Sequence, residues 1–354
     1  MALAFPPNKR VGAMRAGYWY RSMGEALKGD VTVITAQKEA SGDRVHVVPK
    51  SGTSWKTKFI PDEGVIWKKN IQAYLEKTEI ATPSTVIITG GPFMHFSLTN
   101  WFKQKYGCKV ILDYRDPFAT NPGFNNSWIK TEVKCFFEKK FNRAADALVT
   151  VNSYCGKIIE YFDSKPNAIV QNGYDEGVAC NPKPVELGEK VTFSYAGKFY
   201  FDPINLQEAF ESCNVNIDYI GPDEGEWKLP SENINSLGFV DYTTAIEVIG
   251  GADVGIIQTY GHEFQSTTKI FDYLRCERAI LIVSDDKIEE GSIHDELKGY
   301  PNVFWAKNEK QSIIDAIVKI KSETYSKPPE GFANSYSRGF QLGNMVKLIQ
   351  ELEA

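Results

Sequence analysis

Short apolar runs rich in β-branched residues alternate with helical stretches through both halves of the chain, and no other feature limits its fold as much. This alternation is typical of βαβ units, in which helices cover a sheet of parallel strands. The predicted strands are Val31–Thr35, Thr85–Thr89, Lys109–Asp113, Ala147–Val151, Ala168–Val170, Val191–Tyr195, Ile217–Ile220, Val254–Ile257, Ala279–Val283 and Val303–Trp305, with a short opening strand at Met1–Phe5. The expected fold class is therefore α/β with parallel sheets.

Helices are predicted between the strands and after the last one. They include Ser127–Arg143, Tyr154–Phe162, Tyr242–Ile249, Lys310–Ser322 and Gln341–Leu352. Because 354 residues exceed the length that one core usually serves, we expect two doubly wound domains. The proline-rich stretch Asn181–Pro184 is of linker type and divides residues 1–183 from residues 184–337. The apolar stripe of the last helix must cover a core, so residues 338–354 are expected to pack back onto the first domain.

Charge is distributed unevenly between the two halves. Residues 1–183 contain 25 Lys and Arg against 17 Asp and Glu, whereas the remainder contains 15 against 28. A basic half suits an anionic partner, such as a phospholipid surface or a phosphate-bearing acceptor, and the alternative explanation is chance.

Composition excludes several classes of protein. With 42% hydrophobic and 24% charged residues, the chain has an ordinary globular composition. No apolar run approaches the roughly 18–20 residues that a membrane span needs. Six cysteines without a C-x-x-C pair indicate buried thiols in a reducing compartment, and the sequence has no D-x-D pair of the kind that binds a metal–diphosphate. We therefore expect a cytoplasmic protein without a metal site.

Two motifs in the first half are candidates for binding an anion or a reacting group. In P-P-N-K-R-V-G-A-M-R, Gly12 lets backbone amides approach a ligand closely before a helix begins; the alternative is an ordinary glycine turn. In L-D-Y-R-D-P-F, which ends a strand, Arg115 can hold Asp113 or Asp116 ionised. The alternative is a buried Asp–Arg pair that only anchors the loop.

A third motif lies in the second half, in S-T-T-K-I-F-D-Y-L. Thr267 and Thr268 are expected to cap a helix, with Lys269 in its first turn and Asp272 on the same face. A cation and exposed helix amides suit a diphosphate, and a carboxylate can accept hydrogen bonds from ribose hydroxyls. The strand ending in Y-A-G-K-F adds Lys198, so that two lysines could bind one diphosphate; a plain capping motif is the alternative.

Taken in order, the motifs are similar to those of the GT-B glycosyltransferases, specifically the family-4-like nucleotide-sugar transferases of bacterial cell-surface polysaccharide assembly. The matching segments cover nearly the whole chain. They are F-P-P…G-A-M-R, T-G-G-P-F-M-H, L-D-Y-R-D-P-F, A-D-A-L-V-T-V-N-S, V-Q-N-G-Y-D, Y-A-G-K-F, L-G-F-V, A-D-V-G-I-I and T-T-K-I-F-D-Y-L.

The resemblance implies two Rossmann-like domains facing a central cleft, with the acceptor on the first domain and a UDP- or GDP-linked sugar on the second. It implies a retaining hexosyltransferase that needs no cofactor or metal and binds a glycan or lipid-linked acceptor, not nucleic acid. Lys198 and Lys269 match the family's phosphate contacts, and Asp272 matches its ribose-binding acid. Gly12 matches its backbone contact to the diphosphate, and Asp116 matches the strand-end group that approaches the sugar.

One departure from the family keeps alternatives open. The first acid of the usual E-x7-E pair is missing, because Phe264 stands eight residues before Asp272 and Glu263 is one place off. A catalytically silent GT-B binding subunit is therefore one alternative. A nucleotide-sugar 2-epimerase is another, although four histidines without a clear constellation argue against it.

Two further features of the first half remain as hypotheses. His95 follows a Gly-Gly-Pro turn and is either a loop-packing histidine or a cleft residue near the acceptor. The helix Ser127–Arg143 is amphipathic, and Trp55–Lys58 and Trp67–Lys69 add basic–aromatic pairs. These features suit weak peripheral association with the inner face of a membrane, and a core-facing helix with a solvated basic rim is the alternative.

Overall fold

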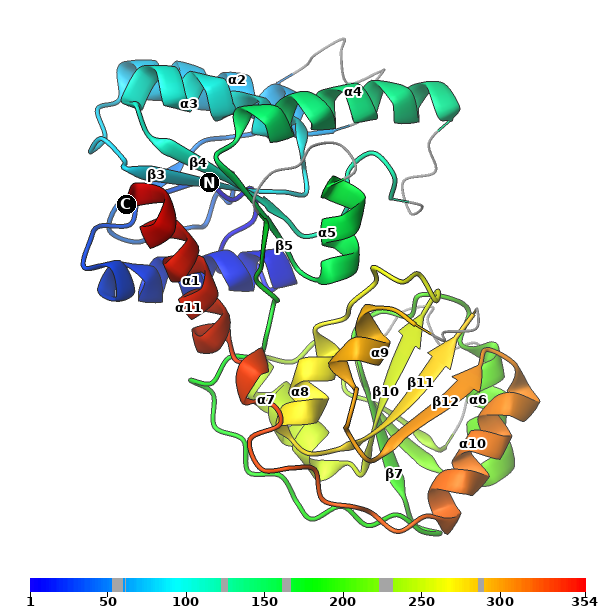
Figure 1. The fold of residues 1–354 in the computed structure, drawn as a ribbon. Helices are drawn as coiled ribbons and strands as arrows, with labels where there is room; N and C mark the ends of the chain where they lie inside the picture. The colour runs from blue at the N-terminus through cyan, green and yellow to red at the C-terminus, as the bar shows by residue number, and fades with distance from the viewer. Residues whose placement is uncertain (53–59, 61, 122–126, 161–166, 223–231, 286–289) are drawn as a thin grey trace. The chain divides into compact units, whose positions relative to one another are not determined.

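The computed structural model describes residues 1–354 except 53–59, 61, 122–126, 161–166, 223–231 and 286–289. It divides into two compact units (Figure 1). Unit 1 comprises Met1–Asn172 and Arg338–Ala354, and unit 2 comprises Gly173–Ser337. Residues 338–354 therefore belong to the same unit as the start of the chain.

The boundary lies before Gly173 and not after Lys183, so the proline-rich stretch is no linker between the units. Its backbone is bound to unit 2 instead. The Lys183 N–H donates to the Gly250 carbonyl at 2.9 Å, and Arg278 donates to the Lys183 carbonyl at 2.7 Å. Prolines there give a rigid segment on the surface of unit 2, which composition alone does not distinguish from a linker.

Unit 1 contains two groups of parallel strands. Strand β1 (Val33–Thr35) pairs with β2 (Val45–Val47), and a four-stranded sheet has the order β3-β4-β5-β6. Its members are β3 (Thr85–Thr89), β4 (Lys109–Tyr114), β5 (Ala147–Thr150) and β6 (Asn167–Ile169).

Residues 1–3 join these two groups through backbone hydrogen bonds. The Ala2 N–H donates to the Ile34 carbonyl beside β1, and the Thr89 N–H of β3 donates to the Met1 carbonyl, each at 3.1 Å. The Leu3 carbonyl accepts from the Ala36 N–H at 3.2 Å. The predicted opening strand is thus too short to be a regular strand, but its backbone occupies a strand position between β1 and β3.

Helices cover the sheet of unit 1, and its last helix comes from the far end of the chain. They are α1 (Val11–Leu27), α2 (Gly64–Lys77), the 3-10 helix η2 (Met94–Leu98), α3 (Thr99–Tyr106), α4 (Trp128–Ala144), α5 (Ser153–Glu160) and α11 (Arg338–Glu353). Helix α11 lies beside α1 (Figure 1), and its Met345 and Ile349 pack in one buried cluster with Trp19 of α1 and Val149 of β5.

Unit 2 is a six-stranded parallel sheet in the order β12-β11-β10-β7-β8-β9. The strands are β7 (Thr192–Ala196), β8 (Asn216–Ile220), β9 (Ile234–Ser236), β10 (Val254–Thr259), β11 (Ala279–Ser284) and β12 (Val303–Lys307). The sequence order of strands therefore reverses at β7, whose neighbours are β8 and β10. Ligands bind at the carboxyl ends of the strands at such a switch point.

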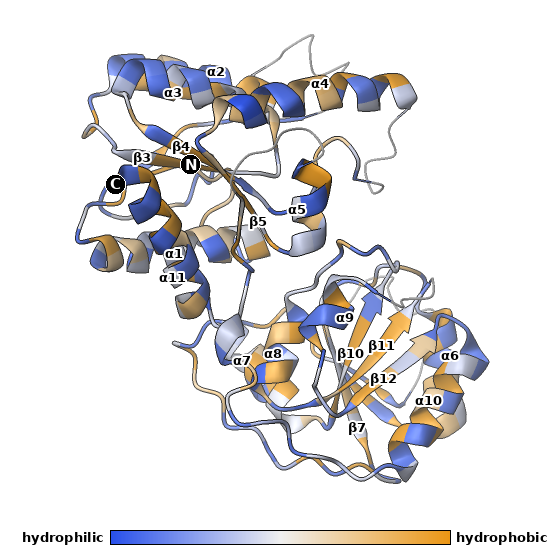
Figure 2. Ribbon diagram, viewed as in Figure 1, coloured by the Kyte–Doolittle hydropathy of each residue, from blue (hydrophilic) through white to orange (hydrophobic). Residues whose placement is uncertain are grey.

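Helices lie on both faces of this sheet. They are α6 (Ile204–Cys213), α7 (Tyr242–Gly251), α8 (Lys269–Arg275), α9 (Ser292–Glu296), the 3-10 helix η4 (Asn334–Tyr336) and α10 (Lys310–Ser322). One buried cluster joins α6 and α10 to the sheet, and a second joins α7, α8 and α9 to its other face. Figure 2 shows why: β11 is hydrophobic along its length, whereas α10 combines a hydrophobic with a hydrophilic face.

All ten strands predicted within the chain are present, with ends that agree or differ by at most two residues. The sequence does not predict β2 and β9, which are three residues long and only partly buried or exposed, because they carry little apolar signal. Of the predicted helices, Lys310–Ser322 agrees at both ends, and the last two residues of Tyr154–Phe162 lie outside the described residues.

Candidate functional site

The carboxyl end of β7 in unit 2 brings a lysine onto a glycine turn. Gly197 follows the strand at φ +110°, a left-handed conformation that favours glycine. A Cβ at this position would lie 2.7 Å from Cε of Lys269 and 3.0 Å from its Nζ. The missing side chain therefore lets the first residue of α8 lie across the end of β7, where the strand order reverses.

The Lys269 ammonium is held by aromatic residues. It donates to the Tyr195 hydroxyl at 3.3 Å and lies 4.5 Å from the centre of the Tyr195 ring and 5.6 Å from that of Tyr200. A cation–π contact of this kind stabilises the ammonium form of a lysine side chain. These contacts with Tyr195 and Tyr200 fix the position of the Lys269 ammonium at the end of β7.

The turn that carries Lys198 is also supported by aromatic packing. Phe199 stacks against Tyr195, at 4.6 Å between ring centres, and against Tyr219, at 5.2 Å, and these two tyrosine rings lie 6.1 Å from each other. The Tyr195 hydroxyl donates to the Lys198 carbonyl at 2.7 Å. Residues 197–199 are thus anchored through their backbone and Phe199, and the Lys198 side chain is exposed beside the strand end.

Helix α8 is docked onto the sheet by Tyr273. Gly255 of β10 has no side chain at this contact, and a Cβ there would lie 2.5 Å from the Tyr273 ring. The Tyr273 hydroxyl donates to the carbonyls of Ser194 at 3.3 Å and Ile256 at 3.2 Å. One buried tyrosine therefore sets the position of α8, and with it that of Lys269 and Asp272.

Asp272 is oriented from outside its own helix. The Tyr242 hydroxyl of α7 donates to Asp272 Oδ1 at 2.5 Å, and the same hydroxyl accepts from the Asp175 N–H at 3.4 Å. Asp272 is half-buried and lies three residues after Lys269 in α8. A carboxylate held in this way suits hydrogen-bond donors such as hydroxyl groups.

The predicted capping role of the two threonines is wrong in one respect. Thr268 is the N-cap of α8, but its side chain makes no capping hydrogen bond, because its backbone is already helical. Thr267 is buried and its carbonyl accepts from the Ile270 N–H at 3.2 Å. The structure brings Lys269 against the turn at the end of β7 that also carries Lys198, and in sequence Thr267 and Thr268 come directly before Lys269 and Asp272 follows it in α8.

In unit 1, Gly12 lies in the first turn of α1 and not in a loop, and Arg115 lies against it. A Cβ at Gly12 would be 1.8 Å from Arg115 Nη1. The guanidinium also donates to the Gly90 carbonyl, from Nε at 3.1 Å and from Nη2 at 2.5 Å. Because Gly12 has no side chain, the Arg115 guanidinium lies directly against it. Arg115 therefore places a positive charge at the amino end of the 17-residue helix α1.

Asp113 does not pair with Arg115, which corrects the pairing predicted from sequence. It is fully buried, and Arg15 of α1 donates to its Oδ1 at 2.9 Å. Arg15 also donates to the Gln171 carbonyl at 2.8 Å and lies 4.3 Å from the centre of the Trp19 ring. Asp113 and Arg15 thus form the buried, anchoring Asp–Arg pair that the sequence offered as an alternative, with a different arginine.

Asp116 follows Arg115 at the surface of unit 1. Asp116 is exposed at the surface. Partial desolvation by the surrounding protein nevertheless raises the pKa of its carboxyl group, and the positive charge of Arg115 opposes this shift. Burial lowers the pKa of the Arg115 guanidinium, and Asp113 and Asp116 oppose that shift. Asp116 and Arg115 are therefore the members of this motif that lie nearest the solvent.

His95 is fully buried in η2 of unit 1. Its ring lies 5.0 Å from that of Trp67, and neither ring nitrogen has a partner in hydrogen-bonding geometry among the described residues. Burial lowers the pKa of His95 to about 3, although the Thr89 backbone partly opposes the shift. The histidine is therefore neutral at physiological pH and packs against Trp67 and Phe96; being fully buried, it presents no surface to an acceptor.

Three residues that hold these groups in place were not predicted from the sequence. Tyr242 lies 30 residues from Asp272, and Arg15 lies 98 residues from Asp113, so no local pattern links either pair. Tyr195 stands inside Y-A-G-K-F, and its position two residues before a glycine turn was the signal available.

Neither a metal cluster nor a membrane-spanning helix is found among the described residues. In that part of the chain, no three His, Cys, Asp or Glu side chains are arranged to bind a metal ion. Likewise, none of the described helices is long and apolar enough to cross a bilayer.

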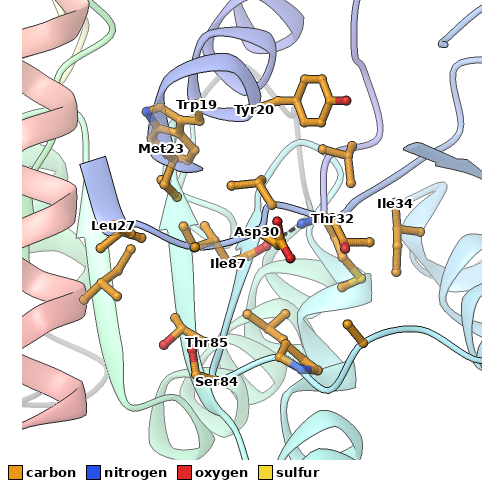
Figure 3. A pocket seen from close by; sticks show the side chains of 18 of the residues that line it. Trp19, Tyr20, Met23, Leu27, Asp30, Thr32, Ile34, Ser84, Thr85 and Ile87 are labelled. Atoms are coloured by element: carbon orange, nitrogen blue, oxygen red, sulfur yellow. Dashed lines mark hydrogen bonds between the residues drawn. The ribbon is translucent and has the colours of Figure 1, made fainter. Parts of the chain in front are cut away.

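A cavity of about 550 Å³ in unit 1 lies away from all these residues. It opens at the amino ends of β1 and β3, opposite the strand ends that bind ligands in such folds. Figure 3 shows its largely apolar lining, which includes Trp19, Met23 and Leu27 of α1 and Ile87 of β3. None of the predicted site residues lines it.

No protein-family model matches the chain, and no curated protein matches its sequence. Solved structures do match. The catalytic domain of starch synthase IV from Arabidopsis thaliana, bound to ADP and acarbose, has a TM-score of 0.59 at 10% identity, covering 99% of this chain and 97% of that one. A GtfA/B complex chain has 0.57 at 12% identity, covering 81% of this chain, which spans only 60% of that one.

A glycosyltransferase of kitacinnamycin is also similar, with a TM-score of 0.53 at 10% identity, over 88% of this chain and 87% of that one. At such low identity these likenesses establish the fold. Together with two units of parallel sheet, they show that the chain has the GT-B fold.

Proposed function

We propose that this protein is a retaining glycosyltransferase that moves a hexose from a nucleoside diphosphate sugar to a glycan or lipid-linked acceptor, without a metal ion. The observation that carries the proposal is the Lys269 ammonium, held by Tyr195 over Gly197 at the point where the strand order of unit 2 reverses. The starch synthase of the same fold was solved with a nucleoside diphosphate bound, which supports this class of ligand.

In this proposal the donor's diphosphate binds at the end of β7. Lys269 and Lys198 balance the negative charge that develops on the diphosphate as the glycosidic bond breaks, which is the effect expected of preorganised cations. Asp272, held by Tyr242, accepts hydrogen bonds from the ribose hydroxyls. The departing phosphate takes the proton of the acceptor hydroxyl on the same face of the sugar, so the configuration is retained.

Unit 1 contributes the acceptor side of the reaction. Asp116 is the carboxylate nearest the solvent in its motif and is proposed to approach the sugar. Arg115, lying across Gly12 at the amino end of α1, supplies a second position that favours an anion. Asp113 acts through Arg15 as an anchor for this strand end.

The test is a transfer and hydrolysis assay over a panel of UDP- and GDP-linked sugars with the intact protein. Lys269→Ala should weaken nucleoside diphosphate binding by about 10- to 100-fold, the equivalent of one charge-assisted hydrogen bond. Lys298→Ala, an exposed lysine elsewhere in unit 2, is the matched control and should leave affinity unchanged. Equal affinity for Lys269→Ala and the wild type would remove Lys269 from the site.

The same assay separates the two alternatives. Nucleotide binding without turnover of any sugar in the panel would indicate a catalytically silent subunit, as the missing first acid before Asp272 suggests. A product whose C2 configuration is inverted, as read by NMR, would indicate an epimerase. Retention at the anomeric carbon of a transferred sugar is the outcome that we expect.

We also propose that α4 of unit 1 binds an anionic membrane surface. The sequence leaves open whether the apolar side chains of this helix face the core or a membrane. Several of them are exposed to solvent, to 76% for Trp128, 57% for Ile129 and 65% for Phe136. The buried residues of this helix are Lys134, Glu138, Phe141 and Asn142, so of the predicted apolar positions Phe141 is the one that is fully buried. Figure 2 shows the mixed hydropathy of this helix.

The other two predicted basic–aromatic clusters add no support to the proposed membrane-binding surface. Trp67 is fully buried and its Nε1 donates to the Val48 carbonyl at 2.9 Å, so it is a core residue. The pair at Trp55–Lys58 lies outside the described residues.

Vesicle sedimentation tests the membrane proposal. The intact protein should bind vesicles containing acidic lipid at low salt and lose most of that binding at physiological ionic strength, because charges are screened within roughly 8–10 Å there. At low salt, Trp128→Ser should reduce vesicle binding relative to the wild type. Val318→Ser, which replaces an exposed apolar residue of unit 2, should leave vesicle binding unchanged. Equal loss in both variants would contradict a role for α4.

A further inference from the structure

Two cysteines from distant parts of the sequence meet at the carboxyl end of α8. The Sγ atoms of Cys180 and Cys276 lie 3.0 Å apart, although 96 residues separate them. Cys276 is the C-cap of α8 and is fully buried, whereas Cys180 lies half-buried in the segment that opens unit 2. Both are free thiols in this structure.

Two arginines hold the segment around Cys180 against this helix end. Arg275 donates to the carbonyls of Asp175, at 2.9 Å, and Val178. Arg278 donates to the Lys183 carbonyl at 2.7 Å. The chain is therefore bound to α8 on both sides of Cys180, so the closeness of the two sulfurs is maintained by the surrounding structure and does not depend on the thiols.

The surroundings also make the two thiols unequal. A hydrogen bond with Cys276, and then the charges of Arg275 and Arg278, lower the pKa of Cys180 to about 7. The same hydrogen bond and burial raise the pKa of Cys276. Cys180 is therefore the more readily ionised of the two thiols, and its buried neighbour is the one that keeps its proton.

We propose that Cys180 and Cys276 form a reversible disulfide in exchange with low-molecular-weight disulfides such as glutathione disulfide. The Cys180 thiolate attacks one sulfur of glutathione disulfide, giving a Cys180–glutathione mixed disulfide and a glutathione thiolate. Cys276 then loses its proton to that thiolate and attacks the Cys180 sulfur, releasing the second glutathione as thiolate. Two protein thiols are oxidised to one disulfide, and one glutathione disulfide is reduced to two glutathione molecules.

The disulfide would tie the opening segment of unit 2 to the helix that starts with Lys269. A disulfide needs its sulfurs about 2.05 Å apart, so the Sγ atoms of Cys180 and Cys276 must approach each other by about 1 Å from their present 3.0 Å. Because the bond closes a long loop, it removes much of the freedom of the unfolded chain. The oxidised protein should therefore melt at a higher temperature than the reduced one.

The experiment uses the reduced, full-length chain incubated with glutathione disulfide and analysed by intact-mass and peptide mass spectrometry. The wild type should lose two hydrogen atoms, and the peptides of Cys180 and Cys276 should be linked. Cys276→Ala should stop at the Cys180–glutathione adduct, because the resolving thiol is missing. Cys180→Ser should react at neither position.

Cys213 provides the comparison within the same unit, since it is also half-buried but burial raises its pKa. Cys180 should be alkylated by iodoacetamide at pH 7 at least about tenfold faster than Cys213. Cys213→Ser should form the disulfide as the wild type does and show the same rise in melting temperature on oxidation. Similar alkylation rates for the two residues, or a wild type that accumulates only the glutathione adduct, would overturn the proposal.

Discussion

At the scale of single residues, the candidate site depends on the absence of a side chain as much as on its presence. Lys269 reaches the end of β7 because Gly197 has no Cβ and adopts φ +110°. The sequence predicted both lysines from the motifs in which they stand. It did not predict Tyr195 as the residue that holds Lys269, because that contact joins residues 74 positions apart.

Gly197→Ala should impair donor binding more than stability. The new methyl group would meet the Lys269 side chain and force alanine into a conformation that it rarely adopts. We expect nucleoside diphosphate affinity, measured by calorimetry, to fall about tenfold or more, the equivalent of about 1.4 kcal/mol or more. Gly188→Ala, at a glycine with open space around it, is the control and should retain wild-type affinity.

His95 should make unit 1 sensitive to acid. Its folded pKa is about 3 against an ordinary 6.5, so between these values the unfolded chain binds a proton that the folded chain does not. The free energy of unfolding should therefore fall as the pH drops through this window. Compared with His95→Leu, the wild type should lose about 1–2 kcal/mol more stability between pH 6.5 and 5.

Urea unfolding at several pH values measures this difference. Glu138, whose burial raises its pKa to about 7, has the opposite pH dependence but is common to both proteins, so its effect cancels in the comparison. Parallel pH profiles for the wild type and His95→Leu would contradict the assignment of acid sensitivity to His95.

At the scale of elements, the strands could be predicted from the sequence, whereas the face that a helix buries could not. Strands β10 and β11 are buried along their length, and their apolar runs Val254–Ile257 and Ala279–Val283 are visible in the sequence. Helix α4 has an apolar pattern that suggests a core-facing stripe, yet it buries Lys134 and Glu138 and exposes Phe136. The Ala119 N–H donates to Glu138, a tertiary partner that no helical periodicity contains.

The docking of α8 through Tyr273 can be tested at Gly255. Gly255→Ala places a methyl group against a buried ring that cannot move aside, so we expect a loss of about 1–3 kcal/mol in the free energy of unfolding of unit 2. Because α8 carries Lys269 and Asp272, donor affinity should fall too. Gly251→Ala, at a position without neighbours, should change neither quantity.

At the scale of the whole molecule, unit 1 is built from two separated parts of the chain. The apolar stripe of residues 338–354 predicted a helix that covers a core, and α11 packs with α1 and β6 in unit 1. The unit boundary was less predictable, because the contacts that bind Lys183 to unit 2 come from Gly250 and Arg278, far along the sequence.

Met345 of α11 offers a test of this arrangement. It is fully buried between α1 and the sheet, so Met345→Ala should lower the free energy of unfolding of unit 1 by about 2–4 kcal/mol. Chemical denaturation followed by intrinsic tryptophan fluorescence, to which the neighbouring Trp19 contributes, would measure the change. Lys347→Ala, an exposed residue on the same helix, should have an effect within about 0.5 kcal/mol.

The backbone of residues 1–3 has a consequence for local unfolding. Within the described chain these residues supply the backbone hydrogen bonds that connect β1 to β3, so strands β1 and β2 are attached to the larger sheet by three residues. Fraying there would leave β1 and β2 without backbone hydrogen bonds to the larger sheet, while β4 and β5, paired on both sides, stay closed. Amide hydrogens of β1 and β2 should therefore exchange with solvent ahead of those in β4 and β5, and unit 1 should open from this edge first.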